Sequence, residues 1–425
     1  MVPLTRLPDG TVKQVSPFTG TQVWTLPGRA ARPLAVPEGA AQPLDPALHD
    51  GHCAFCWARM IETTPEIARV VHDEAHRWRA LREIGPESLW STTPQFRLFP
   101  NLFEILSYDY WHLSHGFEPT PESQTRRAAY LASPAGRAQL VSLARIRMRS
   151  RGAPGWDAEP LAESDLDRES VGLFAGNHQV IAARRHYLDG ATDDSQLASS
   201  GTLTPEEHWQ YTAFAISAMR DLYRGNPHAR YVSVFQNWLR PAGASFDHLH
   251  KQLVAIDEFG AQIEREAARA RAEPEFYQRW GAGYAAEQGL IVARTPTAVA
   301  FAGVGHRYPS LEVHTTRPDC PPWQLADDEV RDFSDLLHAC HAATGVHVPT
   351  NEEWHHRPPS LHLPMPLRAV LKWRVSTLAG FEGGTKIYVN TIDPWTVRDH
   401  TSGRLRELAS HELISDRVQL VHSGA

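Results

Sequence analysis

The sequence has few cysteines, no long apolar run and no excess of positive charge. Four cysteines in 425 residues are too few for a disulfide-stabilised scaffold, which favours a reduced compartment. No stretch approaches the roughly 20 apolar residues that a membrane-spanning helix needs, and the opening residues lack the apolar core of a signal peptide. The net charge of −7 argues against a general nucleic-acid-binding surface. We therefore expect a soluble cytoplasmic protein without nucleic-acid or membrane partners.

The composition is otherwise that of an ordinary folded protein. Hydrophobic residues make up 42% of the chain and charged residues 21%, far from a disordered composition. The chain is long enough for two domains, or for two fused copies of one unit, each with its own core. A nucleotide-sized anion can still bind to such an acidic protein, because a few local arginines are sufficient.

The first half of the chain shows both helical and extended patterns. Residues 59–84 have a helix-forming composition after Thr64 and Pro65, which are suited to cap and open a helix. The patterns that follow predict a buried strand within 96–106, a mostly helical insertion at 107–172, a strand at 178–187 and a helix from Pro205 to about Tyr223.

Two apolar runs, at 231–239 and 248–256, predict a β-hairpin, because Pro241 and Gly243 between them supply a turn. The second half predicts a helical connection at 259–286, strands at 290–304 and 310–316, a helix near 327–343 and strands around 360–390. Since the strand pairs are joined by short loops, an antiparallel α+β fold is expected rather than a parallel doubly wound sheet.

The most informative segment is the strand that contains His248, His250 and Gln252. Alternate residues of a strand point to one face, so these three polar side chains lie together while Leu249 and Leu253 face the core. A neutral imidazole can attack phosphorus and divide a difficult group transfer into two easier steps. A second imidazole two residues away can bind a metal or orient the first. The pattern alone is compatible with a structural role for the histidines as well as with a catalytic strand, and the neighbouring segments favour the catalytic interpretation.

A pair of cysteines, Cys53 and Cys56, has the spacing that grips one zinc ion. A zinc site needs two more ligands, and no second CxxC pair is present. Histidines must therefore complete it, and His186 and His248 are the best placed. A thioredoxin-like redox pair and two unmetallated buried thiols are the alternatives. A third feature is the pair Arg29 and Arg32, whose guanidinium groups can clamp a phosphate. A solvated surface pair is the alternative interpretation.

Taken together, these segments resemble galactose-1-phosphate uridylyltransferase, a family of the histidine-triad superfamily. The matching segments occur in family order and are PFTGTQVWTLPGRAARP, CAFC, FRLFPNLFEI, VFQNWLRPAGASFDHLHKQLVA and LAGFEGGTKIYVN. The last segment, and ETTPE after the cysteine pair, are closer to the ADP-glucose phosphorylase-like branch. The resemblance implies two histidine-triad-like α+β units in one chain, with antiparallel sheets and flanking helices. The units correspond to residues 1–258 and 259–425.

The resemblance also implies a role for each matching residue. His250 is the expected nucleophile, assisted by Gln252, and His248 is expected to join Cys53, Cys56 and His186 around one structural Zn2+. The residues expected around the nucleotide and its phosphates are Arg29, Arg32, Asn101, Asn237 and Ser245.

The sequence departs from the family at several points. Leu249 stands between the two histidines in place of proline, and His186 lies one residue closer to its strand than in the family pattern. The segment TKIYVN replaces the glutamine that uridylyltransferases use on the hexose phosphate. These departures affect the substrate more than the chemistry.

The function predicted from the sequence is ping-pong transfer of a nucleoside monophosphate from a nucleoside diphosphate-sugar to a phosphate or sugar-phosphate acceptor. One alternative is a phosphorylase or hydrolase of nucleoside polyphosphates or ADP-sugars. Another is a catalytically inactive, zinc-stabilised nucleotide-binding protein. The expected partners are small-molecule nucleotide-sugar and phosphate substrates, with a homodimer as a further option.

Overall fold

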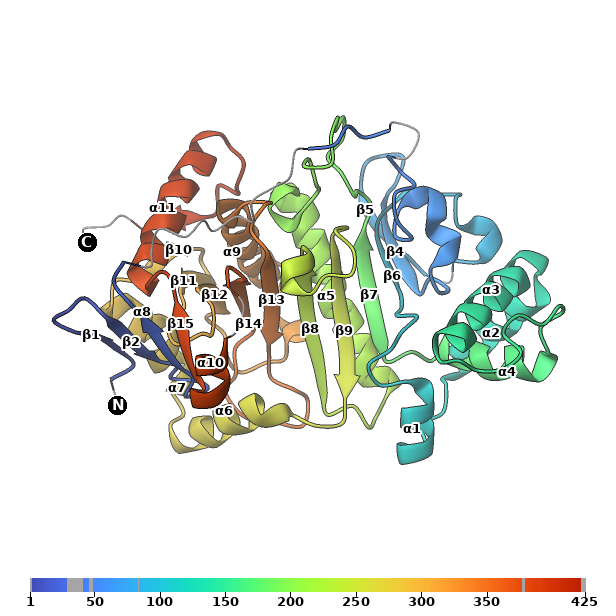
Figure 1. Ribbon diagram of the computed structural model, residues 1–425, viewed down its shortest axis with the longest axis horizontal. Coiled ribbons are helices and arrows are strands. Elements are labelled where there is room, and N and C mark those ends of the chain that lie inside the picture. The colour runs from blue at the N-terminus through green and yellow to red at the C-terminus, as the bar shows by residue number, and fades with distance from the viewer. Residues whose placement is uncertain (1, 29–40, 46–48, 83, 377–378, 422–425) are drawn as a thin grey trace.

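A computed structural model describes residues 2–28, 41–45, 49–82, 84–376 and 379–421, and Figure 1 shows its arrangement. A 12-stranded sheet runs through the molecule in the order β16-β10-β11-β12-β14-β13-β8-β9-β7-β6-β4-β5, and every neighbouring pair in it is antiparallel. Its strands from the first half of the chain are β4 (Ala68–His72), β5 (Trp78–Arg82), β6 (Pro94–Pro100), β7 (His178–Ala183), β8 (Tyr231–Trp238) and β9 (His250–Ile256). Those from the second half are β10 (Ile291–Arg294), β11 (Ala298–Ala302), β12 (Ser310–Thr315), β13 (Thr350–His355), β14 (Arg368–Trp373) and β16 (Gln419–Leu420).

The two halves of this sheet have the same topology. Outward from the centre, the first half has β8, β9, β7, β6 and β4, and the second has β13, β14, β12, β11 and β10. In each half, therefore, the fourth of these five strands along the chain lies innermost, followed by the fifth, third, second and first. The central pair, β8 and β13, joins the halves. The fold is thus α+β and contains the same antiparallel unit twice.

The helices lie around and beside this sheet. They are α1 (Tyr108–His115), α2 (Pro121–Ala132), α3 (Pro134–Ser150), α4 (Glu163–Gly172), α5 (Pro205–Gly225), α6 (Gly260–Ala272), α7 (Phe276–Gln278), α8 (Tyr284–Glu287), α9 (Asp327–Thr344), α10 (Gly380–Thr385) and α11 (Pro394–Ser410). The long helices α5 and α9 connect the third and fourth strands of their halves and cover one face of the sheet, here called the back face (Figure 1). Thr204 caps α5 through its hydroxyl, which accepts the N–H of Glu207.

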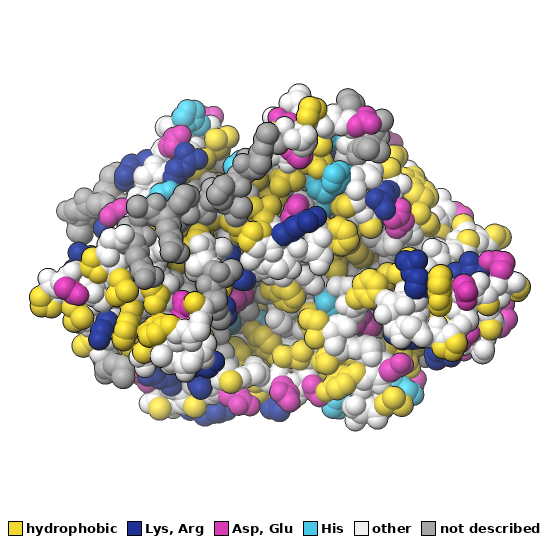
Figure 2. Space-filling view, viewed as in Figure 1, with side chains coloured by type: hydrophobic (Ala, Val, Ile, Leu, Met, Phe, Trp, Pro, Cys, Tyr) yellow, Lys and Arg dark blue, Asp and Glu magenta, His cyan; other side chains and the backbone are white. Residues whose placement is uncertain are grey.

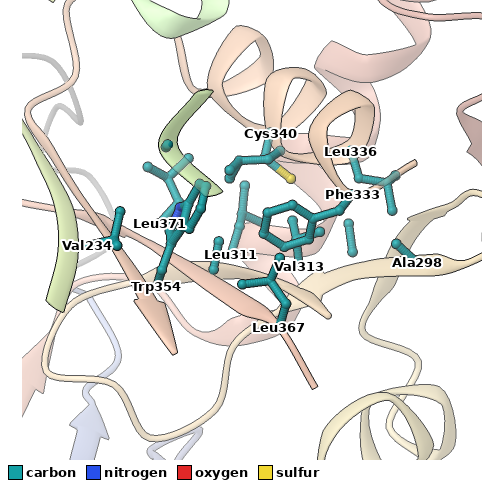
Figure 3. Packing of buried hydrophobic residues seen from close by; sticks show 14 of the residues in the cluster. Val234, Ala298, Leu311, Val313, Phe333, Leu336, Cys340, Trp354, Leu367 and Leu371 are labelled. Carbon is teal, nitrogen blue, oxygen red and sulfur yellow. The ribbon is translucent and has the colours of Figure 1, made fainter. Parts of the chain in front are cut away.

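The main core lies between the back face and these two helices. Figure 3 shows Phe333, Leu336 and Cys340 of α9 pointing toward strand residues such as Leu311 and Val313. Both sides of this contact are buried, and burial of such apolar side chains provides about 25 cal/mol per Å² of stabilisation. The back face is therefore occupied by packing.

The opposite face, here called the front face, differs between the halves. A small sheet of β1 (Leu4–Arg6), β2 (Val12–Val15), β3 (Gln22–Thr25) and β15 (Ile387–Asn390) lies against the second half (Figure 1). Gly305, at a φ of +72°, permits this approach, because a Cβ there would lie 2.0 Å from the Ser16 nitrogen. The N–H of Gly305 also donates to Gln14 Oε1 at 3.0 Å.

Several predicted elements are present. The segment at 107–172 is helical (α1 to α4), α5 begins after Thr204, and β8 and β9 form an antiparallel pair. The predicted domain boundary between residues 258 and 259 falls between β9 and α6. One sheet continues across this boundary, and the strands before residue 26 pack with the second half. The division into two separate domains therefore stays a prediction. Strand β13 and helix α11 lie outside the predicted elements. No described helix is both long and apolar enough to cross a membrane.

The helix predicted at 59–84 is wrong. This segment has a short 3-10 helix (Trp57–Glu62) followed by the antiparallel pair β4 and β5. Val70 and Val71 favour a strand, and Asp73 forms a tight turn by accepting the N–H groups of Ala75 and Arg77. Strand pairing therefore overrides the helix-forming composition of this segment.

Candidate active site and metal centre

The site lies on the front face of the first half, around the start of β9. Gln252 pairs with Val180 of β7 on one side and with Phe235 of β8 on the other. His250 opens the strand opposite Ala182. Leu249 and Leu253, on either side of this pair, are fully buried in the core on the back face, as the alternation of a strand requires. Figure 2 shows that the front face is hollowed over the middle of the sheet.

Four buried side chains converge beside the start of β9: Cys53, Cys56, His186 and His248. Their ligand atoms all lie within 4.8 Å of one another. The two sulfur atoms are 3.7 Å apart. His248 Nδ1 lies 3.5 Å from Cys53 Sγ, and His186 Nδ1 lies 3.6 Å from Cys56 Sγ. The four residues predicted as metal ligands are therefore brought together.

These distances fit a tetrahedral metal ion. With bonds of about 2.3 Å to sulfur and about 2.0–2.1 Å to nitrogen, tetrahedral geometry places the sulfur atoms about 3.8 Å apart and each sulfur–nitrogen pair about 3.6 Å apart. The sulfur pair and three of the sulfur–nitrogen pairs have these spacings before any ion is considered, and all four ligand atoms lie within 4.8 Å of one another. The buried Cys2His2 group could therefore bind one metal ion.

The protonation of the cluster also suits a metal. His248 donates its Nε2–H to the carbonyl of Ala183 at 2.7 Å, which leaves the Nδ1 lone pair facing the sulfur atoms. The hydrogen bond from Cys53 lowers the pKa of Cys56, and His186 acts in the same direction. The same hydrogen bond between the two thiols, together with burial, raises the pKa of Cys53. A thiolate, the form that binds metals, is thus favoured at Cys56.

His250 is held in one tautomer by the backbone. Its Nδ1 lies 2.7 Å from the carbonyl oxygen of His248, and because a carbonyl only accepts, Nδ1 must carry the proton. Nε2 therefore keeps its lone pair. Burial lowers the pKa of His250 to about 4, so the imidazole is neutral at physiological pH. This is the form that a nucleophile requires.

An apolar patch lies next to His250 on the front face. Phe99, Val180 and Ala182 form a small buried cluster with the half-buried Phe55 packed on it. The ring of Phe55 also contacts that of His250 at 5.3 Å between centroids. A flat aromatic ligand such as a nucleobase can stack on such a surface.

Two of the predicted site residues, Gln252 and Asn101, both contact His178, which the sequence analysis did not single out. His178 Nε2 lies 2.9 Å from Gln252 Oε1 and 3.1 Å from Asn101 Nδ2. His178 lies in the strand predicted at 178–187, but its proximity to Gln252 depends on the pairing of β7 with β9. Local sequence patterns carry no information on that pairing.

The remaining predicted residues divide into three groups. Asn237 of β8 faces Asn351 of β13 across the centre of the sheet. Ser245 is exposed in the turn before β9, with no described hydrogen bond from its side chain. Arg29 and Arg32 lie outside the described residues.

Comparison with known proteins places the chain in a family. The family described as "Domain of unknown function (DUF4921)" matches residues 7–424. The chain belongs to this family. Among curated proteins, none matches the sequence.

Solved structures show the fold of this DUF4921 chain in other proteins. An ADP-glucose phosphorylase from Arabidopsis thaliana with bound ADP-glucose is 17% identical, with a TM-score of 0.58 over 92% of this chain and 98% of that one. A galT-like protein from Arabidopsis thaliana is 16% identical, with a TM-score of 0.56 over the same shares, 92% and 98%. The chain therefore has the galT-like fold over nearly its whole length.

Among its described residues, the second half of the chain has no copy of this site. Arg368 opens β14 and pairs with His314 of β12, in the place where His250 opens β9 and pairs with Ala182 of β7. Its guanidinium group is buried in an ion pair with Glu266 of α6. The equivalent position is thus filled by a charged pair and covered by a helix.

Proposed function

We propose that the protein transfers a nucleoside monophosphate through a covalent intermediate on His250. The observation that carries the proposal is the fixed tautomer of this residue. Its Nδ1–H is bound to a backbone carbonyl, and its neutral Nε2 is left as a nucleophile on the front face.

The transfer has two steps. His250 Nε2 attacks the α-phosphorus of a nucleoside diphosphate-sugar, a phosphorus–nitrogen bond forms, and the phosphorus–oxygen bond to the sugar phosphate breaks. An oxygen of phosphate or of a sugar phosphate then attacks the same phosphorus, and the bond to nitrogen breaks. The amides of Gln252 and Asn237 stabilise charge on the phosphoryl oxygens. The apolar patch around Phe55 and Phe99 holds the base.

Cys53, Cys56, His186 and His248 are proposed to hold one structural Zn2+. The ion would fix the cysteine-containing loop to the start of β9, because all four protein ligands complete its coordination and no position is left for substrate. His248 would then connect the metal to His250 through its carbonyl oxygen. The metal supports the orientation of the nucleophile rather than the chemical step.

A phosphorylase is the second candidate, with inorganic phosphate as acceptor and an ADP-sugar as donor. The structural likeness to an ADP-glucose phosphorylase over 92% of this chain favours it. This candidate is the narrower case of the same transfer, in which the donor is an ADP-sugar and phosphate alone is the acceptor, so the first step is shared. Arg29 and Arg32 are proposed to bind the phosphates in either case, and Asn101 and Ser245 to contact the nucleotide.

Covalent labelling tests the proposal. The protein is incubated with labelled UDP-glucose or ADP-glucose and its intact mass is measured. An acid-labile increase equal to one nucleoside monophosphate is expected with one donor, and adding phosphate or a sugar phosphate should discharge it. Tight binding of every donor without a mass increase would show instead a nucleotide-binding protein that lacks catalysis.

We also propose that the protein acts in the cytoplasm, as a soluble enzyme. The four cysteines are free and buried, which fits a reduced compartment. A homodimer is part of the same proposal, and light scattering on the purified protein tests it directly.

A further inference from the structure

We propose that two residues outside the predicted site, His178 and Asn351, are positioning residues for its phosphate-binding amides. His178 orients the amide of Gln252. Asn351 orients the amide of Asn237. In each pair the carbonyl oxygen of the amide is held within the protein, so the NH2 group is the part that remains for the substrate. This inference rests on the proposed nucleotidyl transfer. It adds the hydrogen bonds that orient the NH2 groups of Gln252 and Asn237 toward the substrate.

The first relay is the chain of hydrogen bonds from Ile105 through His178 to Gln252. It begins at a backbone N–H, which can only donate. Ile105 donates to His178 Nδ1 at 3.2 Å, so the ring proton must be on Nε2. That Nε2–H lies 2.9 Å from Gln252 Oε1. Burial lowers the pKa of His178, which keeps the ring neutral and preserves this arrangement. The N–H of Ile105 therefore fixes the orientation of the Gln252 amide, whose oxygen faces His178.

Asn101 does not compete for this proton. Its own Oδ1 accepts the N–H of Phe103 at 3.0 Å, so only its NH2 group faces His178. Two donors cannot bond to each other. The Nε2–H of His178 is therefore directed to Gln252 alone.

The second relay begins at an arginine, which also can only donate. Arg374 Nη1 donates to Asn351 Oδ1 at 2.6 Å. Asn351 Nδ2 must then be the group that faces Asn237 Oδ1, at 2.7 Å. The same nitrogen also donates to the carbonyl of Ala242 at 2.8 Å, which confirms its direction. Asn237 therefore turns its oxygen toward the second half of the chain.

The two relays have the same result. Among the described residues, neither Gln252 Nε2 nor Asn237 Nδ2 donates a hydrogen bond to another protein group. Both amides are half-buried on the front face that carries His250. Phosphoryl oxygens only accept hydrogen bonds, so an amide turned the other way would repel them. Donors fixed before the reaction stabilise developing charge without reorganisation.

Single variants and double-mutant cycles test the first relay. His178→Phe keeps the ring but removes the donor, and should slow single-turnover covalent labelling roughly 10- to 100-fold. His178→Gln can still donate to Gln252 Oε1 and should restore most of the rate. If His178 acts through Gln252, then His178→Phe should add no further loss to Gln252→Ala. Full additivity of the two losses would overturn the assignment.

The second relay has a sharper variant, Asn351→Asp. The carboxylate still accepts from Arg374 but cannot donate to Asn237, so the Asn237 amide is released. Labelling should slow to a similar extent, and Asn351→Asp should add no further loss to Asn237→Ala. Preference between the two diastereomers of an α-phosphorothioate donor should also fall. A general packing defect would leave that preference unchanged.

The failure of this inference differs from failure of the proposed function. Wild-type protein that is never labelled by any donor overturns the proposed transfer, and the inference with it. Wild-type protein that is labelled, with His178→Phe and Asn351→Asp labelled at the same rate, overturns the inference alone. Metal content and melting temperature measured on each variant show that the fold is retained.

Discussion

The two halves of the chain share one topology but differ on the front face. In the first half, the residue that opens the fifth strand is His250, a neutral imidazole next to the ring of Phe55. In the second half it is Arg368, which is ion-paired with Glu266 and stacked over Phe18 and Tyr277, with 4.7 and 4.9 Å to the ring centroids. The first half has a neutral, buried imidazole at this position, whereas the second half uses the same position to attach helix α6.

The second half nevertheless serves the first. Lys251, next to the proposed nucleophile, points to the back face and pairs with Glu352 of β13. Glu352 also accepts from His341 of α9 at 2.6 Å, and the pair is almost fully buried. On the front face Asn351 orients Asn237. In the proposed mechanism, the second half therefore supports the site of the first half through these contacts.

The largest expected effect comes from removing the proposed nucleophile. His250→Asn should reduce transfer by about 10⁴-fold or more, equivalent to roughly 5–6 kcal/mol of barrier, and should abolish covalent labelling. Metal content should stay unchanged, because His250 is not among the four clustered ligands. The measurement is single-turnover transfer with the best donor.

The matched control is His248→Asn, two residues away. It should lose metal and stability first, with activity falling as a consequence. If His250→Asn instead retains near wild-type turnover, the covalent mechanism is wrong. If the two variants exchange phenotypes, the roles of the two histidines are reversed.

The next largest effect concerns the metal centre. Cys56→Ser should remove the bound metal and lower the free energy of unfolding by several kcal/mol, because metal binding is coupled to folding. Elemental analysis should find about one zinc per wild-type chain and far less in the variant. Cys320→Ser, at another buried cysteine outside the cluster, should leave the metal content unchanged. Wild-type protein without zinc would contradict the proposed cofactor.

The ion pair of the second half gives a smaller effect of a different kind. Arg368→Met leaves the buried carboxylate of Glu266 without its partner and should destabilise the protein by about 3–5 kcal/mol. The folded fraction at low temperature should keep its transfer rate, because the pair supports packing and not chemistry. Urea unfolding and single-turnover rates measure the two properties. Arg294→Met, at an exposed arginine, should change stability by less than about 0.5 kcal/mol.

Local patterns predicted the centre of the site better than its surroundings. The alternation that places His250 and Gln252 on one face operates within a single strand, so it could be read from the sequence. The helix predicted at 59–84 failed because pairing with distant strands outweighed local composition. His178 and Asn351 could not be foreseen, since each meets its partner through the register of strands that are far apart in the chain.

The smallest effect expected is an acid-dependent loss of stability in the second half. His356 is fully buried at the end of β13, its ring stacked on Tyr231, and burial lowers its pKa from 6.5 to about 3. The unfolded chain therefore binds a proton more readily than the folded protein between these two values, so this contribution to stability is complete above about pH 6.5 and is lost as the pH falls toward 3. At pH 5 the loss should be about 2 kcal/mol. His356→Phe should flatten the fall in unfolding free energy between pH 7 and 5, measured by urea titration at each pH. His362→Phe, at an exposed histidine, should leave the slope unchanged. An equal slope in wild type and His356→Phe would mean that the folded protein binds a proton on His356 as readily as the unfolded chain does. The second half would then tolerate an unpaired buried charge at His356, in contrast to Arg368, whose buried charge is paired with Glu266.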